Sequence, residues 1–222
     1  AVSGPVIVNP ELLKKVADEL GLAAAVVART VYRSLNSVAG KNTTRSRREV
    51  VSRVNLKDKY VRDRMDLQKA SPKRATAVIA ARRRSTTLAT YGALQKVKAA
   101  PEPKNGKRRH PLRGDPLRGI PAGKIQAGIS VSVKRGSGRK IVKGGKSFFV
   151  PLQAGSKGGA ANGFGVFIRT GSGRSAIRHQ YGPSVNDVLR QVFPDIQPDV
   201  QAELEAALLR QARYEFGKAL GK

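Results

Sequence analysis

The sequence predicts an α+β fold in which N-terminal helices pack on an antiparallel β-sheet, with C-terminal helices after it. Three observations support this prediction. Apolar residues recur at helical spacing over the first 70 residues, they alternate with polar residues at strand spacing between residues 129 and 169, and helical spacing returns after residue 184. At 222 residues, a single α+β domain with a long insertion is the simplest interpretation.

Four segments follow from these changes of period. Residues 1–98 contain the N-terminal helices and first strands, and residues 99–128 form a basic loop rich in Pro and Gly. Residues 129–180 contain antiparallel strands, and residues 181–222 form a C-terminal helical assembly segment.

The N-terminal segment begins with a helix start, because Asn9 can cap a helix that opens at Pro10. A second helix from residue 22 places apolar residues on one face at spacings of four and three. Gly40 either breaks this helix or sits inside it. A short helix around Tyr60 then leads into a strand at Met65. The core-seeking residues of the second helix are Val27, Val31, Leu35 and Val38.

The middle of the chain changes to short strands. Residues 76–81 and 86–91 are strand candidates, and residues 129–134 alternate apolar and polar side chains. Further strands are expected at residues 140–143, 147–152 and 164–169, joined as a meander by Gly-rich turns.

The C-terminal segment begins at Ser184, which can cap a helix in a box with Asp187. Pro194 and Pro198 are expected to interrupt it, so that a separate last helix follows. That helix presents Val200, Leu204, Ala207 and Leu208. We expect Val200, Leu204 and Leu208 to be exposed in the monomer and buried on subunit contact; a place in the domain core is the alternative for the two leucines.

Charge indicates a polyanionic partner. The chain has 43 Lys and Arg against 15 Asp and Glu, a formal charge of +28. Residues 71–180 hold 24 of these cations and only two acids, Glu102 and Asp115. Aromatic residues make up 5% and are not interleaved with the basic runs, which favours non-specific contact with the DNA backbone over base stacking. The DNA-contact candidates are Arg82, Arg83, Arg84, Lys107, Arg108, Arg109, Arg135, Arg139 and Arg174.

No enzymatic chemistry is visible, and we expect neither a cofactor nor a metal. There is no cysteine, the two histidines, His110 and His179, lie far apart in the sequence, and residues 120–180 contain no acid. Gly144-Gly145-Lys146-Ser147 lacks the first Gly of a phosphate-binding loop. No apolar run approaches the roughly 20 residues of a membrane span, so no membrane partner is expected.

Two blocks carry a resemblance. The first runs from Ala28 to Ala70 and includes Leu56-Lys57 and the run VRDRM at 61–65; the second contains ISVSVK at 129–134 and FGVFIRTGSGRSAIRHQYGPSV at 164–185. Together and in this order they resemble the prophage minor tail protein Z family of long-tailed phages.

That resemblance implies a structural virion protein, a tail-completion component at the head-proximal end, or neck, of the tail. It implies assembly in the host cytoplasm, a homo-oligomeric ring, and contacts with other tail and neck proteins. The alternative is a sequence-independent nucleic-acid-binding protein of ribosomal or chromatin type. From composition alone, residues 181–185 are a turn and helix start. The resemblance makes them assembly candidates with two C-terminal leucines: Tyr181, Gly182, Pro183, Ser184, Val185, Leu204 and Leu208.

Overall fold

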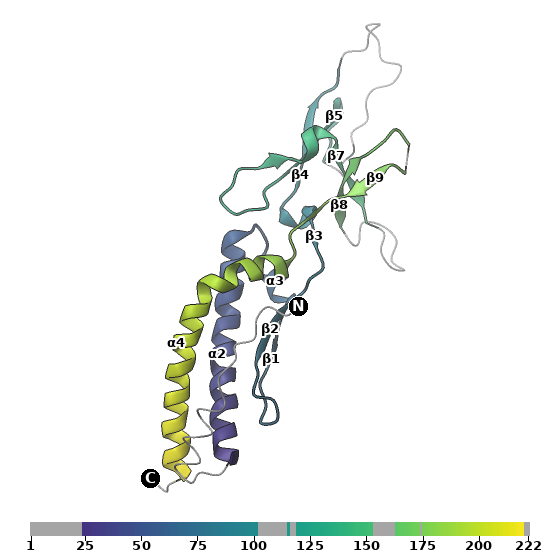
Figure 1. Cartoon of the computed structure of the whole chain (residues 1–222). Helices are drawn as coiled ribbons and strands as arrows, with labels where there is room; N and C mark the ends of the chain where they lie inside the picture. Colours follow the sequence, from purple (N-terminus) through teal and green to yellow (C-terminus); the bar gives the residue numbers. More distant parts are fainter. Residues whose placement is uncertain (1–23, 102–114, 116–118, 153–162, 174, 220–222) are drawn as a thin grey trace. The chain divides into compact units, whose positions relative to one another are not determined.

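The computed structural model describes residues 24–101, 115, 119–152, 163–173 and 175–219 (Figure 1). Helices and several small antiparallel sheets confirm the predicted α+β class. The chain divides into two compact units. The helical unit comprises Ala1–Ser52, Lys57–Arg84 and Ser184–Lys222, and the strand unit comprises Arg53–Leu56 and Ser85–Pro183. The helix expected after Pro10 lies outside the described residues.

Two long helices dominate the helical unit. Helix α2 spans Ala24–Arg53 and helix α4 spans Val185–Ala219, and they lie side by side (Figure 1). Gly40 sits inside α2, which settles the alternative left open by the sequence. The helices run antiparallel, because residues of increasing number on α2 bond residues of decreasing number on α4. The bonded pairs are Arg33 with Glu215, Ser34 with Ala207, and Asn42 with Glu203.

The apolar faces of these helices form the core of the helical unit. The buried cluster combines the predicted stripe of α2 with residues of α4 and two alanines near the β1–β2 hairpin. Burial of each Val or Leu side chain contributes about 1.5–3 kcal/mol. The cluster consists of Val31, Leu35, Val38, Ala70, Ala77, Val200 and Leu204.

Helix α4 continues through Pro194 and Pro198, so the prediction of an interruption is wrong. An interior proline removes a backbone hydrogen bond and costs about 3 kcal/mol or more. Both prolines are exposed, whereas Val192, Ile196 and Val200 on the opposite side are buried. Packing of that side therefore holds the helix together across the prolines, and Figure 1 shows the ribbon bending in its N-terminal part.

A hairpin completes the helical unit. Helix α3 (Asp58–Arg62) leads into strand β1 (Met65–Gln68), as the sequence predicts, and β1 pairs antiparallel with β2 (Val78–Ala81). The side-chain amide of Asn36 on α2 binds the backbone of Ala70 twice: its Nδ2 donates to the carbonyl at 3.0 Å, and its Oδ1 accepts the N–H at 2.7 Å. This pair of bonds ties the hairpin to α2.

The strand unit contains three sheets. Strands β3 (Thr86–Thr87) and β10 (Tyr181–Gly182) form one. Strands β4 (Leu94–Ala99), β5 (Lys124–Val131) and β6 (Lys140–Ile141) form the second. Strands β7 (Ser147–Pro151), β8 (Phe164–Arg169) and β9 (Ile177–His179) form the third, an antiparallel meander. The meander predicted for residues 129–169 is instead divided between the second and third sheets, because β6 and β7 do not pair, and β9 was not predicted.

The predictions for two strands and one loop need correction. Only Thr86–Thr87 of the segment 86–91 is extended, and Leu88–Tyr91 forms a 3-10 helix, whose three-residue period puts Leu88 and Tyr91 on one buried face. Likewise Val142–Gly145 is a 3-10 turn, so β6 ends at Ile141. The expected loop 99–128 is strand at both ends, since β4 reaches Ala99 and β5 begins at Lys124.

The register of β4 and β5 explains part of this difference. The pairing shifts between Lys96 and Val97, where Gly128 has φ +103°. Such a bulge breaks the alternation of apolar and polar residues that identifies a strand in a sequence. Residues 102–114 and 116–118 of the expected loop lie outside the described residues.

Candidate functional surfaces

Residues 181–183, which end the strand unit, pack against the fully buried side chain of Tyr91. The Tyr91 hydroxyl donates to the carbonyl of Pro183 at 2.6 Å. A Cβ at Gly182 would lie 2.6 Å from Cε2 of the Tyr91 ring, so only glycine fits there. Successive strand residues point to opposite faces. Tyr181 is therefore directed away from Tyr91, and its side chain is 52% exposed.

The rest of the motif belongs to the helical unit and starts α4. Ser184 Oγ accepts the N–H of Asp187 at 3.0 Å, and Asp187 Oδ2 accepts the N–H of Ser184 at 3.0 Å, which confirms the predicted capping box. These hydrogen bonds from Ser184 lower the pKa of Asp187 below its ordinary value. Val185 is buried. Of the five motif residues, Tyr181 is the exposed one.

Tyr181 ends a column of three aromatic rings. Phe167 on β8 and His179 on β9 are cross-strand partners whose ring centroids lie 4.4 Å apart with planes 12° from parallel. The His179 ring lies 4.3 Å from the Tyr181 ring at 44°. Phe167 and His179 are half-buried, so the accessible end of this aromatic column (Phe167, His179 and Tyr181) is Tyr181.

Burial sets the state of the middle ring. Desolvation lowers the pKa of His179 below its ordinary value, which favours the neutral imidazole at pH 7. Its Nε2 is buried and has no hydrogen-bond partner in the described part of the chain. A Cβ at Gly165 would lie 2.7 Å from Phe167 and 2.8 Å from His179 Nε2, so this glycine makes room for both rings. The column is therefore packed and uncharged.

Arg169 lies on the face of the β7–β8–β9 sheet that also carries Phe167. Phe148 is the cross-strand neighbour of Phe167, and the guanidinium of Arg169 lies 5.6 Å from the centroid of the Phe148 ring. Arg169 is exposed and donates from Nη1 to the Gly173 carbonyl at 3.1 Å. Sequence reasoning missed this site because Phe148, Phe167 and Tyr181 lie on different strands, far from one another along the chain. The available signal was that side chains two residues apart on a strand, such as Phe167 and Arg169 of β8, share one face of the sheet.

The strand unit is strongly cationic. Its described residues include twelve Lys and Arg, and Asp115 is the single acid among them. Of the predicted DNA-contact residues, Arg135 and Arg139 lie here and are both exposed. The Arg139 guanidinium hydrogen-bonds the Gly92 carbonyl and reaches Ser130 Oγ at 3.5 Å. Arg139 thus also connects three segments of its own unit.

The remaining predicted contacts are spread over other parts of the chain. Arg82, Arg83 and Arg84 belong to the helical unit and are exposed, with no acidic partner among the residues that the structure describes. Lys107, Arg108, Arg109 and Arg174 lie outside the described residues. The structure therefore does not bring the nine candidates together into one described site.

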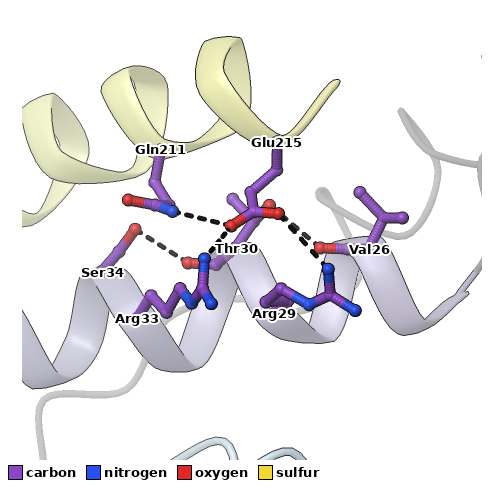
Figure 2. A network of polar contacts seen from close by, with 7 residues as sticks. All are labelled: Val26, Arg29, Thr30, Arg33, Ser34, Gln211 and Glu215. Atoms are coloured by element: carbon purple, nitrogen blue, oxygen red, sulfur yellow. Dashed lines mark hydrogen bonds and ion pairs between the residues drawn. The ribbon is translucent and has the colours of Figure 1, made fainter. Parts of the chain in front are cut away.

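A buried carboxylate links the N-terminal part of α2 to the C-terminal part of α4 (Figure 2). Glu215 on α4 is 3% exposed and receives a hydrogen bond from Arg33 Nη1 of α2. Gln211 Nε2 donates to the same oxygen, Oε1, at 3.0 Å, and Arg29 Nη1 lies 3.7 Å from the other oxygen, Oε2. Both arginines are about half-exposed, so their charged groups remain partly hydrated. The sequence did not mark Glu215.

Further along α2, arginines also pair within the helical unit. Arg45 binds both Asp199 and Glu203 of α4, and Arg47 Nε lies 3.1 Å from Asp58 Oδ1. Their acidic neighbours favour a structural role.

An apolar pocket in the helical unit carries two unmatched polar atoms. Asn42 Oδ1 and Ser46 Oγ are buried without a hydrogen-bond partner among the described residues. Such atoms cost free energy unless water or another group reaches them. The pocket is lined by residues of α2, β2, α4 and the segment before β2: Leu35, Val38, Ala39, Asn42, Ser46, Ala77, Ile79, Leu189, Phe193, Ile196, Val200 and Leu204.

The predicted C-terminal contact surface differs from expectation. Val200 and Leu204 are 3% and 6% exposed and belong to the core of the helical unit, and Leu208 is partly buried against it. The prediction that they are exposed in the monomer is wrong, and the core alternative holds for Leu204. The large apolar residues that are exposed on the described part of α4 are instead Leu209 and Tyr214, at 63% and 60%.

The described residues were also searched for a phosphate-binding loop, a metal site and a membrane-spanning helix. Ser147 begins strand β7 where a phosphate-binding loop would begin a helix. No group of three His, Asp or Glu among the described residues is placed to hold a metal. None of the described helices is both long and apolar enough to cross a bilayer.

Comparison with known proteins bears on nearly the whole chain. The model of the family described as prophage minor tail protein Z matches residues 14–220. No curated protein and no solved structure matches the chain. The match includes both blocks that carried the resemblance, the Ala28–Ala70 region and the run ending at Val185. The chain therefore belongs to the prophage minor tail protein Z family and is a structural protein of the phage tail.

Proposed function

We propose that this minor tail protein completes the tail at its head-proximal end and contacts DNA through the strand unit. The observation that supports DNA contact is the twelve Lys and Arg against one acid among that unit's described residues. A polyanion relieves the repulsion of so many like charges, and phosphate contact releases counterions from DNA. The tail end that meets the head is where a tail protein encounters DNA entering the tube.

The two units differ in how their cations are used. In the helical unit Arg29, Arg33, Arg45 and Arg47 pair with acids of the same unit. In the strand unit the acids needed for such pairs are nearly absent from the described residues. The strand unit therefore offers a phosphate backbone cations that almost no acid of the same unit compensates.

Neutralising matched sets of lysines tests this assignment. Lys96, Lys98 and Lys140 are exposed in the strand unit, and Lys41, Lys57 and Lys59 are exposed in the helical unit. Replacing each set with Gln removes the same charge from the protein. We expect only the strand-unit variant to lower the slope of log affinity against log salt for duplex DNA, by up to about 0.9 for each phosphate that the variant no longer neutralises.

Fluorescence anisotropy with two unrelated duplexes measures both slopes. Equal slopes for the two variants would exclude the strand unit as the DNA-binding part, and a strong preference for one duplex would exclude backbone contact. A triple variant tests the exposed arginine cluster of the helical unit separately: it combines Arg82→Ala, Arg83→Ala and Arg84→Ala. Its salt slope is measured in the same way, and circular dichroism checks that it is folded.

Position and assembly need a test in particles. We infer a homo-oligomeric ring at the neck, in contact with other tail and neck proteins. Immunogold labelling of purified phage should place the protein at the head–tail junction, and sedimentation of the purified protein should give a closed oligomer. Label at the distal tail tip would contradict the neck assignment. DNA binding by a monomer that never enters particles would favour the alternative of a cellular nucleic-acid-binding protein.

A further inference from the structure

We propose that the aromatic column ending at Tyr181 is a stacking site for an unpaired nucleobase of single-stranded DNA. The inference rests on the proposed DNA contact and adds a base-reading element to it. In this view the cations of the strand unit hold the phosphates, and a base continues the column Phe167, His179, Tyr181. Such stacking is tolerant of sequence, because every base has a flat π-face.

The orientation of Tyr181 is the first argument. Gly182 is pressed against the buried Tyr91 ring, and the Tyr91 hydroxyl bonds the Pro183 carbonyl at 2.6 Å. Strand pairing of Tyr181 with Thr87 holds the backbone on its other side. The exposed ring is therefore presented by a fixed backbone, which reduces the entropy lost when a base stacks on it.

The support behind Tyr181 is the second argument. His179 lies between Tyr181 and Phe167 and is neutral at pH 7, because burial lowers its pKa. Phe167 and His179 are nearly parallel and packed over Gly165. An added base therefore meets a supported aromatic surface instead of a side chain that is free to rotate into solvent.

Charge decides what kind of ligand fits this surface. Arg169 lies on the same sheet face, two residues along β8 from Phe167, and its guanidinium has N–H donors for a phosphate beyond the one that bonds Gly173. Lys146 is exposed in the turn before β7, and its carbonyl accepts the backbone N–H of Arg169 at 3.4 Å. A phosphodiester strand supplies negative charge and flat bases together, whereas a protein partner would need a matching run of acids.

Two oligonucleotides separate stacking from backbone contact. One is a fluorescein-labelled oligothymidine of about twelve nucleotides, a length within the usual range of site sizes. The other is an abasic strand with the same number of phosphates. We expect the wild-type protein to bind oligothymidine about tenfold more tightly than the abasic strand, because base stacking adds to phosphate contact.

The variants isolate Tyr181. Tyr181→Ala should remove the preference for oligothymidine and leave the affinity for the abasic strand unchanged. Tyr181→Phe keeps the ring and should keep the preference. Tyr214→Ala is the matched control, because Tyr214 is a similarly exposed tyrosine of the helical unit, and it should behave as wild type.

Each outcome decides one of the two proposals. If neither strand binds, the proposed DNA contact itself fails. If both strands bind equally to the wild-type protein, the stacking inference fails and backbone contact stands. If Tyr181→Ala weakens both strands equally, or leaves the preference for oligothymidine intact, Tyr181 is not a stacking platform and its exposed ring serves a protein interface or the fold.

Discussion

At the scale of single residues, Glu215 shows how a charge can be structural in a protein with excess positive charge. Its carboxylate is almost fully buried and is held by Arg33, Arg29 and Gln211. A buried charge is costly unless it is paired and hydrogen-bonded. Here the partners come from both α2 and α4, so the pairing also sets the alignment of the two helices (Figure 2).

Glu215→Gln should therefore lower the free energy of unfolding by about 1–3 kcal/mol, because the amide keeps the shape of the side chain but loses the charge that binds the arginines. Urea unfolding followed by circular dichroism measures this change. Glu205→Gln is the matched control on the same helix, because Glu205 is exposed, and its effect should stay within about 0.5 kcal/mol. Equal effects of the two substitutions would contradict a structural role for Glu215.

At the scale of elements, helix α4 illustrates the competition between local preference and packing. Pro194 and Pro198 oppose a continuous helix, yet the helix persists from Val185 to Ala219. Its buried side, which includes Val192, Ile196 and Val200, packs within the helical unit. The burial of these side chains offsets the local cost of the prolines.

Two neighbouring leucines of α4 test which side faces the core. Leu204→Asp should unfold the helical unit or destabilise it by more than about 3 kcal/mol, because it places a carboxylate in an apolar core. Leu209→Asp makes the same chemical change at a residue that is 63% exposed, and it should cost about 1 kcal/mol or less. Thermal unfolding distinguishes these results. A destabilising effect of Leu209→Asp as large as that of Leu204→Asp would contradict the assigned orientation of α4.

At the scale of the whole molecule, the acids that compensate positive charge are distributed unevenly between the described residues of the two units. Intramolecular ion pairs compensate several arginines of the helical unit, whereas the described strand unit has one acid for twelve cations. Like charges destabilise a compact state by repulsion, and salt screens that repulsion. The two units should therefore respond differently to ionic strength.

Raising the salt concentration from about 0.05 M to about 0.5 M shortens the screening length several-fold and should increase amide protection in the strand unit. Amides of β5 and β8 should exchange more slowly at high salt. Amides of α2 and α4 should change less, because salt weakens the ion pairs of these helices at the same time as it weakens the repulsion between like charges. Hydrogen exchange read by mass spectrometry measures each element in the intact protein. Uniform changes in both units would show that charge segregation has no energetic consequence.

Much of the local structure could be predicted, because it depends on neighbouring residues. The stripe Val31, Leu35 and Val38 predicted α2, alternation at residues 129–134 predicted the end of β5, and Ser184 with Asp187 predicted the start of α4. These are short-range effects of helix periodicity, strand periodicity and capping. Bounds were less accurate at β5, where the bulge at Gly128 hides the strand period.

The surface proposed to contact DNA was likewise predicted only in part. Composition predicted a cationic middle of the chain, and the ordered motifs identified the family. The sequence argued against base stacking because aromatic residues are few and are not interleaved with the basic runs. In the strand unit, strand pairing nevertheless brings Phe167 beside His179, and Tyr181 continues the same stack.

The sequence by itself determined the fold class, the family, the overall charge and the helix and strand periods, since each depends on residue type and short spacing. Only the tertiary structure decided that Leu204 lies in the core while Leu209 is exposed, that Glu215 is buried between arginines, and that Tyr181 ends an aromatic column. These outcomes depend on contacts between segments far apart in the chain, such as α2 with α4 and β8 with β9. No local pattern specifies such a contact, because it forms only when both segments have folded and packed.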